Sequence, residues 1–181
     1  MEKNKAIVFD RDGTLINYIP YLHQPKDVKL IDGVSEVLKL LKSKGFKLFL
    51  HTNQSGVGRG YYSLEDVEKC NNEMLRLINL GNDLFEKICI AEDFPPLKDT
   101  YRKPSPKFGN EILNEYQIDR SNLVYIGDNI SDLETAKNIG CRGFGVNYGT
   151  PDLLTKIKAR DDIDYPILNN LLEFSDKLII E

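Results

Sequence analysis

Short apolar runs alternate along this chain with segments whose apolar residues recur at helical spacing. The first run, at residues 6–9, is continuous and rich in β-branched and aromatic residues, as expected for a strand covered on both faces. Alternation of this kind is typical of a parallel sheet whose strands are joined by crossover helices. The sequence therefore predicts a mostly parallel α/β fold, and its 181 residues can bury a core as one domain spanning residues 1–181.

The boundaries of the elements follow from the same periodicity and from capping residues. Ser63 and Asp66 have the spacing of a capping box, and Gly45 and Gly140 stand where left-handed helix caps are expected. We expect strands at residues 6–9, 46–50, 85–90, 123–126 and 143–146, an edge strand at 177–180, and helices at 33–44, 63–78, 108–116, 131–139, 151–159 and about 168–174.

Two segments fall outside this alternation. Residues 56–60 are glycine-rich but lack the spacing of a dinucleotide-binding or triphosphate-binding loop, so we interpret them as a mobile loop that faces a substrate. Residues 92–107 contain four prolines and many charges. They form the longest stretch in which apolar residues recur at neither helical nor strand spacing. Loops of that length in compact domains are often functional.

Composition argues against several classes of protein. Twenty-four Lys and Arg residues against 28 Asp and Glu give a net charge of −4, so we expect no nucleic-acid partner. The apolar runs are too short for a signal peptide or a membrane span, so we expect a cytoplasmic protein with no membrane partner. The three cysteines include no Cys-x-x-Cys pair, which argues against disulfides and a cysteine-rich metal site.

Polar residues that suit one kind of chemistry follow the predicted strands. Ligands of parallel sheets bind beyond the carboxyl ends of the strands, so these residues carry the most information about function. Several carboxylates beside two cations and a hydroxyl would repel one another unless a divalent cation lay among them, and Mg²⁺ shared with a substrate phosphate suits such donors. The set consists of Asp10, Asp12, Thr52, Asn53, Arg102, Lys103, Asp128 and Asp132.

Each motif also has a simpler structural interpretation. A calcium-binding loop is a poor fit, because Thr14 and Leu15 stand where further oxygen ligands and a glycine would be needed. Unrelated turns would not be expected to place these residue types at successive strand ends, so the combination favours function. Taken singly, the segments could be a turn (10–13), a helix cap or turn (52–53), a solvated pair of charges (102–103) and a cap of the following helix (127–132).

The two histidines, His23 and His51, are isolated from each other in the sequence. His51 lies inside the second predicted strand, where a hydrogen-bonded core residue is the better interpretation than a metal ligand or a base. We therefore assign no catalytic role to either histidine.

Four motifs give the chain a specific resemblance to a known family. They are Phe9-Asp10-Arg11-Asp12-Gly13-Thr14, Thr52-Asn53-Gln54-Ser55-Gly56, Arg102-Lys103-Pro104 and Gly127-Asp128-Asn129-Ile130-Ser131-Asp132. They resemble the motifs of haloacid dehalogenase (HAD) superfamily phosphatases, and the chain is similar to the branch of D-glycero-D-manno-heptose 1,7-bisphosphate phosphatases and histidinol-phosphatases. The resemblance implies a Rossmann-like three-layer sandwich. Only residues 15–30 separate the first motif from the next helix, so we expect no large cap domain.

The resemblance implies catalytic and metal-binding roles for the aspartates. Asp10 would be the nucleophile that forms an aspartyl-phosphate, and Asp12 the general acid and then the general base. Mg²⁺ would be held by Asp10, by the main-chain carbonyl of Asp12 and by Asp128, with Asp132 supporting the site from outside.

The other motif residues would bind the substrate. By the same resemblance, Thr52 would donate to the phosphoryl oxygens, and Lys103 would balance the charge of the nucleophile and the phosphate. The residues that hold the rest of the substrate in the heptose enzymes match Asn53, Gln54, Ser55 and Arg102 of this chain.

The chain departs from the family in two places. Residues 18–20 differ from those expected in a substrate-facing stretch. The family commonly has a zinc loop with Cys-x-His and Cys-x-Cys elements, whereas residues 91–101 contain neither Cys nor His, and Cys89 alone cannot supply four ligands. We therefore predict no zinc, and we expect Pro95, Pro96 and aromatic packing to order this loop.

These inferences predict a Mg²⁺-dependent phosphomonoesterase that removes the C7 phosphate of a heptose bisphosphate. A phosphatase for histidinol phosphate or another small phosphomonoester is the alternative among enzymes. A receiver-like signalling module also groups carboxylates, Thr and Lys around magnesium, but its acids precede the Thr and Lys, whereas here Asp128 comes last. A non-catalytic binding protein would not need both Asp10 and Asp12. We expect a monomer whose partner is a small phosphorylated sugar.

Overall fold

Six parallel strands form a sheet at the centre of the protein. The computed structural model describes residues 4–94, 97, 99–149 and 153–179. The strand order is β3-β2-β1-β4-β5-β6, and every neighbouring pair is parallel. The predicted mostly parallel α/β fold is therefore confirmed. The strands are β1 (Lys5–Phe9), β2 (Phe46–Asn53), β3 (Lys87–Ala91), β4 (Leu123–Gly127), β5 (Arg142–Val146) and β6 (Ile167–Leu168).

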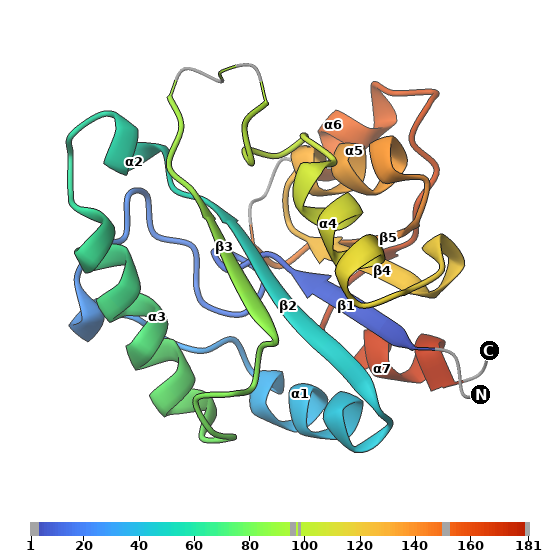
Figure 1. Ribbon diagram of the computed structural model, residues 1–181, viewed down its shortest axis with the longest axis horizontal. Helices are drawn as coiled ribbons and strands as arrows, with labels where there is room; N and C mark the ends of the chain where they lie inside the picture. Colours follow the sequence, from blue (N-terminus) through green and yellow to red (C-terminus); the bar gives the residue numbers. More distant parts are fainter. Residues whose placement is uncertain (1–3, 95–96, 98, 150–152, 180–181) are drawn as a thin grey trace.

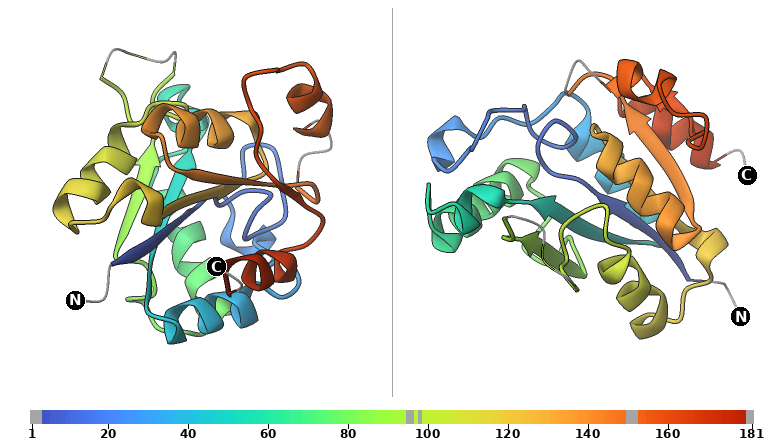
Figure 2. Two further views of the ribbon diagram at one scale, coloured as in Figure 1. Left: turned by 90° about the vertical axis from the view of Figure 1, so that its right-hand side faces the viewer. Right: turned by 90° about the horizontal axis from the view of Figure 1, so that it is seen from above.

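Helices cover both faces of the sheet and give the protein three layers (Figures 1 and 2). In β1, Ile7 and Phe9 belong to the core shared with α1, α3 and α7, whereas Ala6 and Val8 belong to the core shared with α4 and α5. Burial on both faces explains why this strand is continuously apolar. The helices are α1 (Val34–Ser43), α2 (Ser55–Gly58), α3 (Leu64–Ile78), α4 (Lys107–Glu115), α5 (Ile130–Ile139), α6 (Leu153–Lys158) and α7 (Leu172–Ile179), with 3-10 helices η1 (Pro25–Asp27) and η2 (Arg120–Asn122).

The predicted caps are present. The Ser63 hydroxyl accepts a hydrogen bond from the Asp66 main-chain N–H, and the Asp66 carboxylate accepts one from the Ser63 N–H, so α3 begins with a complete capping box. Gly45 and Gly140 follow α1 and α5 with φ angles of 79° and 76°, in the left-handed region that glycine tolerates.

The C-terminal prediction is wrong in two respects. The helix expected at about 168–174 begins at Leu172, and Leu168 lies in a strand. Residues 177–179, expected to begin an edge strand, belong to helix α7, and the edge strand is β6 (Ile167–Leu168); Ile180 lies outside the described residues. Leu171, Phe174 and Leu178 are buried at helical spacing. The Phe174 ring makes an edge contact with Phe9, with centroids 6.1 Å apart. Tertiary packing therefore overrides the local strand preference of the apolar C-terminal run.

The glycine-rich segment is also more regular than predicted. Residues 55–58 form the short helix α2 instead of a loop. The Gly58 N–H donates to the Glu92 carbonyl at 3.1 Å, and a Cβ at position 58 would lie 2.5 Å from that oxygen. A Cβ at position 56 would lie 2.2 Å from the Tyr62 ring. These glycines allow close approach of neighbouring chain segments.

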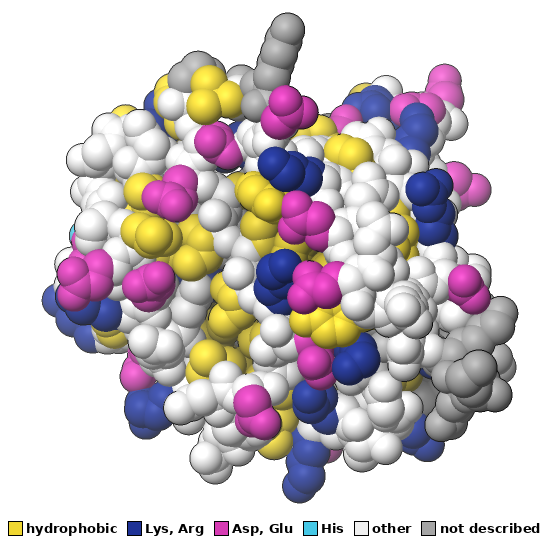
Figure 3. All heavy atoms as spheres, in the orientation of Figure 1, with side chains coloured by type: hydrophobic (Ala, Val, Ile, Leu, Met, Phe, Trp, Pro, Cys, Tyr) yellow, Lys and Arg dark blue, Asp and Glu magenta, His cyan; other side chains and the backbone are white. Residues whose placement is uncertain are grey.

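The insertion between β1 and α1 is small. Residues 10–33, all of them described, contain only η1, turns and isolated bridges, so no cap domain is inserted there. Within the described ranges, no helix has the length and apolar character needed to cross a membrane. On the face shown in Figure 3, basic and acidic side chains are interspersed.

Candidate active site

The predicted site residues converge at the carboxyl edge of the sheet. Asp10 directly follows β1, Thr52 and Asn53 end β2, and Asp128 directly follows β4. They surround a cleft with a volume of about 340 Å³. The cleft is lined by Asp10, Asp12, Tyr18, Thr52, Asn53, Arg102, Lys103, Asp128, Asn129, Ser131 and Asp132.

Asp10 lies in this cleft beside a buried lysine. The Lys103 ammonium donates to Asp10 Oδ1 at 2.6 Å and to Asp132 Oδ1 at 2.5 Å. Burial raises the pKa of Asp10 well above its usual value, while the charge of Lys103 opposes this shift. Burial alone would lower the pKa of Lys103, but Asp10 and Asp132 together raise it above the usual lysine value. Lys103 is therefore a cation at neutral pH.

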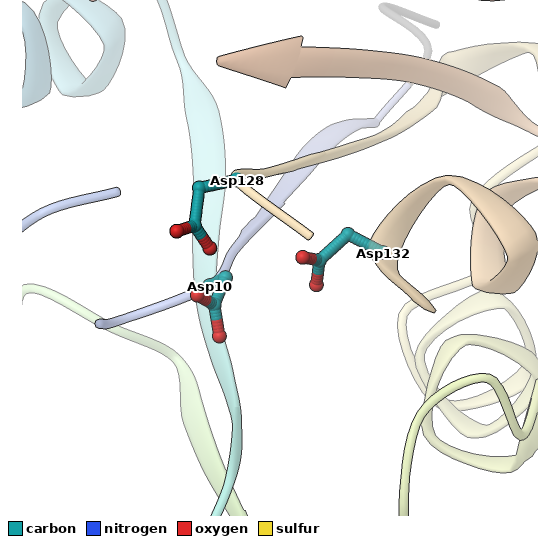
Figure 4. Close-up of side chains that lie close together, drawn as sticks. All are labelled: Asp10, Asp128 and Asp132. Atoms are coloured by element: carbon teal, nitrogen blue, oxygen red, sulfur yellow. The ribbon is translucent and has the colours of Figure 1, made fainter. Parts of the chain in front are cut away.

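Three carboxylates form a cluster that suits a divalent cation. Oxygen atoms of Asp10, Asp128 and Asp132 all lie within 4.8 Å of one another, and Figure 4 shows the three side chains converging from β1, β4 and α5. A Cβ at Gly13, whose φ is +82°, would lie 2.1 Å from Asp128 Oδ2, and one at Gly149 would lie 2.5 Å from the same atom. The donors are all oxygens, as Mg²⁺ prefers, so the residues present fit this metal.

Asp132 combines a structural and a site contact. Its Oδ2 accepts from the Asn129 N–H at 3.1 Å in the capping box of α5, and its Oδ1 accepts from Lys103. The capping interpretation of this motif is therefore correct, and the same carboxylate also faces the cleft. A Cβ at Gly127 would lie 2.2 Å from Asp132 Cγ, which explains the glycine that ends β4.

Asp12 receives hydrogen bonds from two sides. Arg11 donates from Nε to Oδ2 at 3.0 Å and from Nη2 to Oδ1 at 3.1 Å. Gln54 Nε2 donates to the same Oδ2 at 2.9 Å, and the Thr52 hydroxyl lies 3.4 Å from it. The carboxylate of Asp12 is therefore held in one orientation at the wall of the cleft.

The predicted substrate-binding residues differ in their surroundings. The Asn53 amide binds the main chain of Lys103, accepting from its N–H at 2.9 Å and donating to its carbonyl at 3.2 Å. Gln54 is buried, donates to Thr52 Oγ1 at 2.8 Å and accepts from the Tyr62 hydroxyl at 3.0 Å. Ser55 begins α2. In this structure the amides of Asn53 and Gln54 thus hold other site residues in place.

Arg102 lines the cleft on the side of the 91–101 loop. Its Nη1 is buried and has no hydrogen-bond partner among the described residues. Burial lowers the pKa of Arg102 and the charge of Arg59 lowers it further, while the charge of Asp93 opposes the shift. A buried guanidinium nitrogen without a partner in the wall of the cleft is a donor that an anion could use.

The described part of the 91–101 loop is held by side-chain contacts. The Arg59 guanidinium stacks on the Phe94 ring at 3.2 Å from its centroid. The Tyr101 hydroxyl donates to Glu111 at 2.7 Å, and Lys107 donates to the Asp99 carbonyl at 2.9 Å. Pro95 and Pro96, expected to help order this loop, lie outside the described residues.

His51 lies beneath the cleft, fully buried, as the sequence predicts for a core histidine. Its Nε2 donates to the Tyr101 carbonyl at 2.8 Å, and its Nδ1 accepts from the Tyr125 hydroxyl at 3.1 Å. Burial, reinforced by the charge of Lys103, lowers the pKa of His51 to about 3, so it is neutral at pH 7. Its interpretation as a hydrogen-bonded core residue is confirmed.

A second pocket, here called the rim pocket, adjoins the cleft and shares Asp12, Tyr18 and Asn53 with it. Its volume is about 240 Å³. Tyr18 is 49% exposed, and Tyr21 makes an edge contact with Tyr61 at 4.9 Å between ring centroids. Among the described residues, none that lines this pocket is Lys or Arg. It is lined by Asp12, Tyr18, Ile19, Pro20, Tyr21, Leu22, Asn53, Gln54, Ser55 and Tyr62.

The sequence did not reveal three residues that hold the site together: Arg11, Asn71 and Tyr62. Arg11 donates hydrogen bonds to Asp12, and Tyr62 donates one to Gln54. Asn71 accepts one from Arg11. The position of Arg11 between two acidic residues at the end of a buried strand was the one available signal, because a buried arginine requires charged or polar partners. Asn71 and Tyr62 reach the site only through the fold.

Comparison with known proteins adds an independent observation. The haloacid dehalogenase-like hydrolase family matches residues 18–146. D-glycero-beta-D-manno-heptose-1,7-bisphosphate 7-phosphatase of Helicobacter pylori is 36% identical over 140 residues, which cover 76% of this chain and 80% of that protein. D-glycero-alpha-D-manno-heptose-1,7-bisphosphate 7-phosphatase of Campylobacter jejuni is 30% identical over 174 residues, which cover 95% of this chain and 96% of that protein.

A solved structure has the same fold. It is the crystal structure of D,D-heptose 1,7-bisphosphate phosphatase from B. bronchiseptica, complexed with magnesium and phosphate. It matches with a TM-score of 0.85 and 23% identity, and the match covers 97% of this chain and 98% of that chain. The predicted Rossmann-like three-layer sandwich is thereby confirmed.

Proposed function

Because the chain belongs to the haloacid dehalogenase-like hydrolase family and is a phosphatase of that family, we propose that it uses Mg²⁺ to remove the C7 phosphate from a D-glycero-D-manno-heptose 1,7-bisphosphate. One observation carries the proposal. Asp12 and the buried Lys103 line the same cleft as the carboxylate cluster that contains Asp10, at the end of the sheet where such folds bind ligands.

We assign the chemistry to the two aspartates of the first motif. A carboxylate oxygen of Asp10 attacks phosphorus, and the bond from phosphorus to the sugar oxygen breaks as Asp12 donates a proton to that oxygen. Asp12 then removes a proton from water, which attacks the aspartyl-phosphate and releases inorganic phosphate and free Asp10. The contacts of Arg11, Gln54 and Thr52 with Asp12 support a fixed position for the acid.

The metal and the cations would balance the charge of this reaction. Asp10, Asp128 and the main-chain carbonyl of Asp12 would hold Mg²⁺, supported by Asp132. Bound there, Mg²⁺ would supply positive charge to the nucleophile and the phosphate. Lys103 would neutralise further charge from within the cleft, and Thr52 would donate to a phosphoryl oxygen.

The choice of a bisphosphate is supported by Arg102. Its buried Nη1, which has no partner among the described residues, offers a donor for an anionic group apart from the reacting phosphate. Asn53, Gln54 and Ser55 would contact the sugar directly or hold the residues that do. We also propose that the 91–101 loop is ordered by side-chain contacts without zinc, and that residues 1–181 form one domain, since all six strands belong to one sheet.

A substrate panel tests the proposal. Phosphate release would be measured with Mg²⁺ for both anomers of D-glycero-D-manno-heptose 1,7-bisphosphate, for histidinol phosphate and for fructose 1,6-bisphosphate. We expect one heptose anomer to give the highest kcat/KM and to lose a single phosphate, identified as the C7 group by ³¹P NMR. Parallel reactions with EDTA and with Asp10→Asn control for contaminating phosphatases. Much faster turnover of histidinol phosphate than of either heptose would refute the assignment of the substrate.

A further inference from the structure

Arg11 is a fully buried arginine between the two aspartates of the first motif. Its exposure is 0%, which is rare because a guanidinium is costly to remove from water unless charge and hydrogen bonds compensate. Its main chain is also fixed, because the Arg11 carbonyl accepts from the N–H groups of Leu15 and Ile16 at 3.0 and 3.1 Å. The fold therefore determines where the Arg11 side chain begins.

The guanidinium binds Asp12 through two atoms. Nε donates to Oδ2 at 3.0 Å and Nη2 donates to Oδ1 at 3.1 Å. A two-point contact of this kind fixes the plane of a carboxylate as well as its position, which a lysine ammonium cannot do. Gln54 contacts only Oδ2 of this carboxylate, so Arg11 supplies the contact that fixes both oxygens.

Asn71 holds the other side of the guanidinium. Arg11 Nη1 donates to Asn71 Oδ1 at 2.9 Å, and the two residues are 60 positions apart in the sequence. Asn71 is buried on helix α3, where its neighbour Cys70 is also buried in the core. The hydrogen bonds therefore form a continuous connection from the packed helix α3 through Arg11 to Asp12.

We propose that Arg11 and Asn71 are positioning residues that orient the Asp12 carboxyl toward the leaving oxygen of the substrate. This inference rests on the proposed phosphatase function and adds two residues that need not touch the substrate. A general acid accelerates the reaction only when it is within hydrogen-bond reach of the oxygen it protonates. Small displacements in a catalytic arrangement can remove much of its effect.

The inference predicts a dependence on the leaving group. A sugar alkoxide must receive a proton as its bond to phosphorus breaks, whereas nitrophenolate leaves without one. The value of kcat/KM reports the steps up to departure of the leaving group. Loss of orientation at Asp12 should therefore reduce kcat/KM strongly for alkyl phosphates and weakly for p-nitrophenyl phosphate, making a plot of log kcat/KM against leaving-group pKa steeper.

The experiment compares Arg11→Lys, Asn71→Ala and wild type on a series of substituted phenyl phosphates and primary alkyl phosphates with Mg²⁺. We expect Arg11→Lys to lower kcat/KM about 100-fold for alkyl phosphates and less than about threefold for p-nitrophenyl phosphate. Asn71→Ala should show the same trend with a smaller amplitude, and Asp12→Asn should give the steepest plot. Arg76→Lys is the matched control. Arg76 is exposed on α3, the helix that carries Asn71, and it binds the Glu73 carboxylate through Nε and Nη2, as Arg11 binds Asp12.

An equal fall for every leaving group, with the slope of the plot unchanged, would show a merely structural role and would overturn the inference. Circular dichroism would check folding. If Arg11→Lys is not folded, the slope for Asn71→Ala, which retains the contact between Arg11 and Asp12, decides the question. Failure of the proposed function would look different. A chain that is not a phosphatase would release phosphate from none of the esters, and a wrong substrate would appear in the substrate panel without changing the comparison of slopes.

Discussion

The floor of the cleft and its aromatic rim are built in contrasting ways. The floor, which we define as Asp10, Thr52, Lys103, Asp128 and Asp132, is buried and is positioned by strand ends, by the segment before α4 and by the first turn of α5. The rim, which we define as Tyr18, Ile19, Tyr21 and Tyr61, consists of loop residues that are between 37% and 58% exposed. The fold thus fixes the reacting groups, while exposed loops provide the surface that meets the rest of the substrate.

The two regions also differ in charge. The floor has three carboxylates and one ammonium, that of Lys103, which donates to Asp10 and Asp132. Of the described residues that line the rim pocket, Asp12 is the only charged one. Stacking and hydroxyl contacts are therefore the interactions that the rim offers, which suits an uncharged ring, whereas Arg102 offers charge to an anionic group.

The largest effect is expected at the nucleophile. Asp10→Asn should lower kcat by about 10⁴-fold or more, because the first covalent bond to phosphorus can no longer form. Steady-state phosphate release measures this, and circular dichroism checks the fold. The exposed Asp161→Asn is the matched control and should keep wild-type activity. Full activity of Asp10→Asn would remove Asp10 from the mechanism and leave the floor without a nucleophile.

A smaller loss is expected at Thr52. Thr52→Ala should reduce kcat/KM about a hundredfold, as removal of one donor to developing charge typically does. Thr52→Ser keeps the hydroxyl that accepts from Gln54 and should recover most of the activity. If Thr52→Ser lost as much activity as Thr52→Ala, the contribution of Thr52 would come from packing of its methyl group and not from its hydroxyl.

The sequence predicted the floor better than the contacts that support it. Asp10, Thr52 and Asp128 could be located because parallel strands bring their carboxyl ends to one edge, so a local pattern implies a shared site. The contact between Arg11 and Asn71 spans 60 positions and depends on how α3 packs, which no local pattern encodes. The same limitation explains the C-terminal error, since Leu178 is buried in α7 beside the core residue Phe174, although the apolar run that contains Leu178 favours a strand.

The rim should affect binding more than chemistry. Tyr18→Ala should raise KM about fivefold with kcat within about twofold, since one aromatic contact contributes about 1 kcal/mol to ground state and transition state alike. Initial rates over a range of heptose bisphosphate concentrations separate the two constants. Leu154→Ala, which removes an exposed apolar side chain on α6 outside the lining of both the cleft and the rim pocket, should change neither. A fall in kcat for Tyr18→Ala comparable to that for Thr52→Ala would abolish the distinction between floor and rim.

The smallest effect is expected from treating the protein with a zinc-selective chelator, because we predict that it binds no zinc. The loop at 91–101 has no Cys or His, and its described part is held by the stacking of Arg59 on Phe94 and by the hydrogen bonds of Tyr101 and Lys107. Treatment with a zinc-selective chelator, followed by dialysis into Mg²⁺, should therefore leave both Tm and kcat/KM unchanged. EDTA without added Mg²⁺ should abolish turnover, because the carboxylates of the floor would lose their cation. Stoichiometric zinc in the purified protein, together with a fall in Tm after its removal, would show that a metal orders this loop and that side-chain packing alone does not.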